Sequence, residues 1–137
     1  MATNILAMPL VQVSVITGTT EDWVDSIKYV VAPEGASADD DMSTWPQLDL
    51  RGIDFEMELR RNVDDHEVIL NANTKDGTLA IGAPPNFGFL LIHVPYVVMK
   101  TKFADQYVGD IRASTDDEMR IVIPLAVEIF EGVTKSP

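Results

Sequence analysis

The segment 53–61 alternates apolar and charged residues with a period of two. Apolar side chains occupy one set of alternate positions and charged side chains occupy the other, namely Ile53, Phe55, Met57 and Leu59 against Asp54, Glu56, Glu58 and Arg60. In a strand, alternate side chains point to opposite faces, whereas a helix would scatter these apolar groups around its circumference. The segment is therefore predicted to be a β-strand in a sheet with one buried face and one solvated face.

The same extended pattern recurs along the chain. Turns rich in Gly, Asp and Pro separate further predicted strands at residues 10–16, 23–31, 68–72, 79–81, 87–93, 106–113 and 119–130. Pro95 stands early in the segment 95–103, which favours one short helical turn there. Short strands at such regular spacing are typical of a β-sandwich, so an all-β fold is predicted.

Two residues predict where their strands lie in the sheets. Asp25 would share a face with Trp23 and Ile27, so its strand is expected at a sheet edge or in a bend. Pro124 has no N–H to donate to a sheet ladder. The last strand is therefore expected to be an edge at Pro124 or to carry a bulge.

Two other segments predict local connections. Asp76 followed by Gly77 is a hairpin signal, and it leads directly into the strand 79–81. The segment 87–93 is apolar on both faces apart from His93, which predicts a strand in the middle of the core.

The composition is that of a single folded domain. The chain has 137 residues, 46% of them hydrophobic, and no cysteine, which excludes wholesale disorder, a disulfide framework and a thiolate metal site. No apolar run approaches the roughly 20 residues that span a bilayer, and the first residues do not resemble a signal peptide. The predicted β-sandwich domain covers residues 10–135, follows an N-terminal arm at 1–9, and contains a long acidic loop at 32–47.

The net charge of −12 disfavours nucleic acid and anionic membranes as partners. Many of the acidic residues lie between Glu34 and Glu67. They are interpreted either as a solvated face or as a surface complementary to a basic partner.

No arrangement of residues in the sequence points to catalysis, a metal or a cofactor. The acids around His66 are too close together to converge on one metal, and His93 is expected to be a hydrogen-bonded residue at a strand end. Asp54, Glu56 and Glu58 share a strand face as solvated neighbours, not as a carboxylate pair across a cleft. Phosphate-binding and nucleophile-elbow motifs are absent from the sequence. The chain is predicted not to be an enzyme.

The candidate interaction residues lie in the long loop and the N-terminal arm. They are Trp45, Pro46, Asp39, Asp40, Asp41, Leu6 and Met8. A large aromatic in a polar loop either folds back onto the sheet or anchors a neighbour, and both alternatives stand for Trp45. A carbohydrate site would need exposed aromatics, for which Trp45, Tyr96 and Tyr107 are the candidates. The alternative is that Tyr107 is a core residue and Tyr96 caps the helical turn.

Several short motifs occur in the order seen in small tailed-phage and prophage proteins. The residues from Gln47 to Arg60 resemble the leucine-threonine-glycine signature of those families, which leads into an alternating strand that ends in arginine. The flanking motifs that extend the resemblance are Asp22-Trp23, Ile69-Leu70-Asn71, Asp76 to Ile81, Tyr107 to Ile111 and Arg120 to Lys135. Together they make the chain similar to the N-terminal domain of phage baseplate upper proteins.

This resemblance implies an immunoglobulin-like antiparallel β-sandwich with no catalytic residues. It implies a virion location, in the tail, baseplate or fibre-attachment region, within a homo-oligomeric or hetero-oligomeric assembly of virion proteins. A capsid-decorating protein on the phage head is an alternative, and a host-surface carbohydrate-binding module is a further one. The chain departs from the family pattern in its long acidic loop, in Pro124 and in residues 1–9, so the loop and the arm are expected to make contacts peculiar to this assembly.

Overall fold

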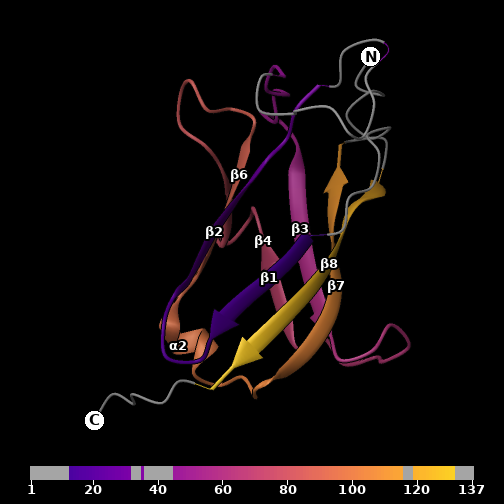
Figure 1. Ribbon diagram of the computed structural model, residues 1–137. Helices are drawn as coiled ribbons and strands as arrows, with labels where there is room; N and C mark the ends of the chain where they lie inside the picture. The colour runs from indigo at the N-terminus through magenta and orange to yellow at the C-terminus, as the bar shows by residue number, and fades with distance from the viewer. Residues whose placement is uncertain (1–12, 32–34, 36–44, 116–118, 132–137) are drawn as a thin grey trace.

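The computed structural model describes residues 13–31, 35, 45–115 and 119–131 (Figure 1). Its elements are, in chain order, β1 (Val13–Gly18), β2 (Trp23–Lys28), β3 (Asp54–Arg60), β4 (Leu70–Asn73), β5 (Leu79–Ile81), β6 (Phe89–Val94), α2 (Tyr96–Met99), β7 (Asp105–Ser114) and β8 (Met119–Phe130). The predicted helical turn is thus confirmed, as α2. Within these residues, no helix is long and apolar enough to cross a membrane.

The strands form two sheets that pack face to face. The larger sheet has five strands in the order β1-β8-β7-β3-β4, and the smaller has three in the order β2-β6-β5 (Figure 1). The prediction of an all-β sandwich is confirmed. The predicted first strand is confirmed only from Val13 onward, because residues 10–12 lie outside the described part of the chain, as does the N-terminal arm.

The strand order is immunoglobulin-like. In the lettering of that fold, β2, β6 and β5 correspond to strands B, E and D, while β8, β7, β3 and β4 correspond to G, F, C and C′. Near the start of β7, the hydroxyl of Tyr107 donates a hydrogen bond of 2.7 Å to the carbonyl oxygen of Phe103. This bond is the tyrosine corner that accompanies the E–F connection in immunoglobulin-like domains.

One pair of strands departs from the expected antiparallel arrangement. β1 runs parallel to β8, with Val13 opposite Leu125 and Gly18 opposite Phe130, whereas the other paired strands are antiparallel. The cause is connectivity. β1 continues through a short turn into β2 of the other sheet, so no hairpin fixes its direction relative to β8.

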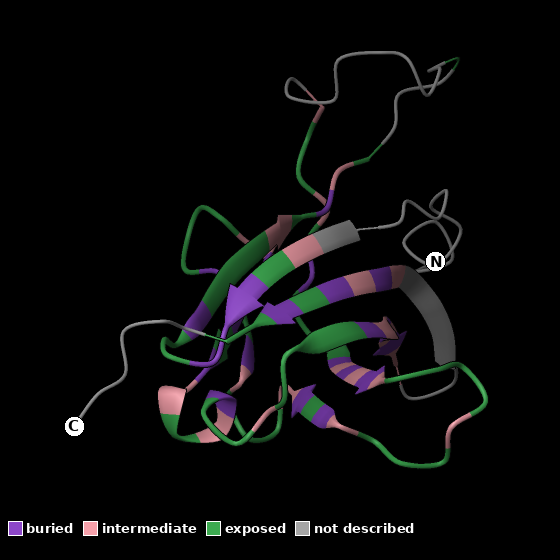
Figure 2. Cartoon of the chain, turned by 60° about the horizontal axis from the view of Figure 1, so that its bottom comes forward, coloured by how far each residue is buried: buried purple, intermediate pink, exposed green. Residues whose placement is uncertain are grey.

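The core fills the space between the two sheets. On β3 the inward side chains Phe55, Met57 and Leu59 are each no more than 2% exposed, and their neighbours on the strand are more open. Figure 2 shows buried segments alternating with more open ones along several strands. The alternation predicted for β3 is confirmed. The ring of Tyr29 packs on Phe55 with 5.8 Å between centroids. Burial of each such large side chain stabilises the fold by about 1.5–3 kcal/mol.

The hairpin predicted at Asp76 and Gly77 is wrong. β4 and β5 belong to different sheets, so the chain crosses the core between them. Side-chain hydrogen bonds shape the crossing, because Asn73 Oδ1 accepts from the N–H of Asp76, and Asp76 Oδ1 accepts from the N–H of Thr78, both at 2.9 Å. The crossing lets β4 and β5 bury apolar residues on opposite sides of the core.

The prediction that the segment 87–93 lies in the middle of the core is only half correct. β6 is the central strand of the smaller sheet, and Leu90 and Ile92 are fully buried. Leu91 is 39% exposed and His93 is exposed, because no other described layer covers the outer face of this sheet.

The expectations for Asp25 and Pro124 are confirmed. β2 is an edge strand of the smaller sheet, and Asp25 is exposed there. In the larger sheet the described pairing of β8 with β1 begins at Leu125, so β7 is the one described neighbour of β8 at Pro124. A bulge lies next to it, where the register between β7 and β8 shifts after Ile111.

Candidate functional site

The two ends of the long loop are held together at its base. The N–H of Val31 donates to the carbonyl oxygen of Pro46 at 2.8 Å, and the N–H of Leu48 donates to the carbonyl oxygen of Tyr29 at 3.0 Å. Val30 and Gln47 form an antiparallel bridge between these two bonds. The loop therefore leaves the sandwich from a short, fixed ladder.

The predicted interaction residues fall partly within the described chain. Trp45 is half-buried and Pro46 is exposed, and both stand beside the ladder at the loop base. The five other candidates lie outside the described residues: Asp39, Asp40, Asp41, Leu6 and Met8.

The two tyrosines proposed for a carbohydrate site have structural roles in the fold. Tyr107 is 2% exposed and forms the tyrosine corner, which confirms the core alternative for this residue. Tyr96 is half-buried at the first position of α2, and its N–H donates to Asp22 Oδ1 at 2.6 Å. Asp22 Oδ2 also lies 3.0 Å from His93 Nε2, which confirms His93 as a hydrogen-bonded residue near its strand end. This hydrogen bond from His93 is the main reason that the pKa of Asp22 is lowered.

The outer face of the larger sheet carries a row of paired charges. Arg112 Nη2 lies 3.0 Å from Glu56 Oε1 and 2.9 Å from Glu58 Oε1. Arg60 Nη2 lies 3.3 Å from Glu58 Oε1, so one carboxylate accepts from two guanidinium groups. The antiparallel register places Arg112 opposite Glu56, and Asp110 opposite Glu58. These five side chains are called the charged row below.

Asp110 is a half-buried member of the charged row. The pKa of Asp110 is raised mainly because burial disfavours its carboxylate, although Arg112 acts in the opposite direction. Arg112 Nε is buried without a hydrogen bond and lies 3.7 Å from Asp110 Oδ1. Asn71 Nδ2 donates to the remaining oxygen of Glu56 at 3.1 Å. The row is thus a flat polar platform whose acids are engaged by neighbouring donors.

The sequence predicted the acids of this row but not their partners. The period-two pattern placed Glu56 and Glu58 on one face, and Asp110 and Arg112 fall within the separate strand predicted at 106–113. That β7 pairs with β3 is a long-range property of the fold, which alternation within one strand does not reveal.

The outer edges of the two sheets differ in how they are protected. β4 and β5 are short edges, of four and three residues. β2 has six residues but carries Asp25 and Lys28, and charges on an edge strand oppose pairing with another strand. β1 also has six residues, and its sequence contains no charge and no proline. The side of β1 away from β8, called the β1 edge below, is paired with no strand in the described chain.

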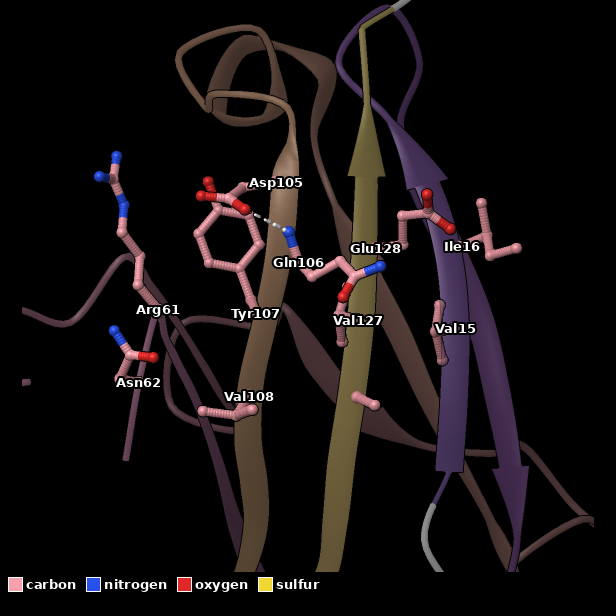
Figure 3. A pocket seen from close by; sticks show the side chains of 11 residues that line it. Val15, Ile16, Arg61, Asn62, Asp105, Gln106, Tyr107, Val108, Val127 and Glu128 are labelled. Atoms are coloured by element: carbon pink, nitrogen blue, oxygen red, sulfur yellow. Dashed lines mark hydrogen bonds between the residues drawn. The ribbon is translucent and has the colours of Figure 1, made fainter. Parts of the chain in front are cut away.

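Exposed apolar side chains accompany the β1 edge. Ile16 is 69% exposed on the outer face, and Phe130 at the end of β8 is 44% exposed. Ile16 lies opposite Glu128 across the parallel pair, beside an open groove of about 690 Å³ that reaches Gln106 on β7 (Figure 3). The apolar end of this outer face therefore lies at β1, and the charged row lies two and three strands away, on β7 and β3.

Among the residues that the structure describes, no group of three or more His, Asp or Glu side chains is placed to hold a metal ion. No protein-family model matches the chain, and a search of curated proteins found no match.

Proposed function

We propose that this chain is a non-enzymatic structural protein that binds neighbouring protein subunits through the β1 edge. The observation that carries the proposal is the contrast among the four edges of the two described sheets, of which β1 alone is both long and free of charge. An unprotected edge presents unpaired N–H and C=O groups, to which an extended segment of a neighbour can add as a further strand.

The charged row supports a role without catalysis. Glu56 and Glu58 both form ion pairs with Arg112 on the outer face of the larger sheet. A carboxylate pair for acid–base chemistry needs one desolvated acid and one base across a cleft. The row instead lies flat on a sheet face and is suited to polar contact with another protein.

The setting that we propose is a tailed-phage virion, in the tail, baseplate or fibre-attachment region. Its support is the resemblance of residues 47–60 and 107–111 to small phage proteins, together with the immunoglobulin-like sandwich that such proteins are expected to have. The expected partners are accordingly other virion proteins.

Fractionation of virions tests this proposal. Particles of the phage or prophage that encodes the chain are purified, washed and separated into heads and tails, and each fraction is analysed by quantitative mass spectrometry. The proposal expects the chain in the tail fraction at a fixed ratio to the tail proteins. Recovery only with heads would show capsid decoration instead. Absence from washed particles would refute the structural role.

A further inference from the structure

We infer that the partner of the β1 edge is a second copy of this chain. Two β1 strands would pair antiparallel about a twofold axis and join two five-stranded sheets into one continuous sheet. The inference rests on the proposed function, because it names the partner of the same edge.

Pairing of β1 with its own copy brings no like charges together, whereas pairing of β2 with its own copy does. In a β2–β2 pair, the Asp25 carboxylates would come close together on adjacent strands, and like charges at such short range are destabilising. β1 brings no charged side chain to the junction. An identical neutral edge is therefore complementary to it.

Two copies of the chain repel each other, because each has a net charge of −12. The nearest outer-face carboxylate, Glu128, lies one strand inside β1. With strands about 4.8 Å apart, the two Glu128 side chains would be roughly 14 Å apart, and the acids of β3 roughly 34 Å apart. The Debye length is about 8 Å at physiological ionic strength, so most of this repulsion is screened.

A further argument is the exposed apolar surface at this edge. Ile16, which is 69% exposed, would gain contact with outer-face side chains of the added strand. Phe130 already lies over Gly18, where an added Cβ would meet the ring at 2.8 Å. The ring thus extends the apolar surface beside the edge. Pairing through one six-residue strand makes a small interface, for which a roughly micromolar dissociation constant is expected.

Sedimentation velocity of the full chain tests the inference, over a range from about 5 to about 500 µM that brackets the expected affinity. A monomer–dimer equilibrium is expected. Ile16→Lys should raise the dissociation constant about tenfold or more, because it places a charged side chain on each strand of the junction. Val24→Lys is the matched control, since Val24 is also β-branched, lies on the β2 edge strand and is 69% exposed. This control should leave the dissociation constant unchanged.

Three results would overturn the inference: a monomer at every concentration, a dimer that Ile16→Lys leaves intact, or equal weakening by the two lysine variants. Thermal melts of both variants verify that each is folded, and Ile16→Glu provides a second charged variant at the same site. A monomeric chain that is still recovered in virion tails would contradict only the second-copy partner. Loss of the chain from virions would contradict the proposed function itself.

Discussion

The hydroxyl of Tyr107 donates a hydrogen bond of 2.7 Å to the carbonyl oxygen of Phe103. It fixes the entry into β7, the strand that pairs with both β3 and β8. Tyr107→Phe removes the hydroxyl and leaves that carbonyl without this donor. We expect the free energy of unfolding to fall by about 1 kcal/mol, measured by urea denaturation.

Tyr29→Phe is the control for that variant and has the opposite expected sign. Tyr29 is 1% exposed, and its hydroxyl is buried without a hydrogen bond. Burial of this unpaired group also raises the pKa of Tyr29. Its removal should leave stability unchanged or raise it by up to about 1 kcal/mol. A larger loss in Tyr29→Phe than in Tyr107→Phe would contradict the assigned hydrogen bonds.

Replacing Arg112 should destabilise the larger sheet. Arg112→Ala leaves Glu56, Glu58 and Asp110 close together on one face without their shared cation. These groups are partly exposed, so solvent screens the loss, and we expect a decrease in the free energy of unfolding of about 1–2 kcal/mol. Lys75→Ala is the control, because Lys75 is exposed and the variant has the same change in charge. If both variants unfolded at the same urea concentration, the charged row would have no role in stability.

Gly109 allows β7 to approach β3. A Cβ added at this position would clash with the carbonyl oxygen of Glu58 and lie 2.7 Å from a methyl group of Leu59. Because the nearest atom belongs to the backbone, the strands must separate to admit it. We expect Gly109→Ala to lower the free energy of unfolding by about 2 kcal/mol, measured by calorimetry. An unchanged melting temperature would contradict the close packing of these two strands.

The pair of Asp49 and Arg51 predicts a loss of stability in acid. Hydrogen bonds from the Arg51 side chain are the main reason that the pKa of Asp49 falls from its ordinary value of 3.8 to about 2. A lowered pKa in the folded state stabilises above pH 3.8, and the contribution disappears as the pH falls towards 2. The urea midpoint of the natural chain should therefore exceed that of Asp49→Asn at neutral pH.

The same comparison at low pH provides the check. Between pH 3.8 and 2 the two midpoints should converge, since the natural carboxylate becomes protonated there. A difference between the two proteins that persists unchanged below pH 2 would show that Asp49 acts through something other than its charge.

The sequence predicts what depends on local patterns. Alternation in the segment 53–61 correctly predicted which side chains of β3 are buried, and Pro124 correctly indicated a bulge in its strand. A strand presents its apolar residues at every second position whatever its neighbours are. These features can therefore be predicted without knowledge of the rest of the fold.

The features that the sequence did not predict correctly are relations between distant segments. Asp76 and Gly77 have the composition of a hairpin turn, yet the chain crosses there to the other sheet, because β5 pairs with β6. The parallel pairing of β1 with β8 and the contact of Arg112 with Glu58 are likewise set by topology. Which strands lie at the sheet edges is also set by topology, so the free side of β1 depends on its pairing with β8.

The central claim is that the chain assembles with its neighbours through the β1 edge, and incorporation into particles tests it most directly. Phage particles are produced with the natural chain, with Ile16→Lys or with Val24→Lys, and the chain in washed particles is quantified. Both positions are 69% exposed in the isolated protein, so both variants are expected to fold. We expect the Ile16→Lys chain to be lost from particles and the Val24→Lys chain to be retained at the natural level. Full incorporation of Ile16→Lys would contradict the central claim.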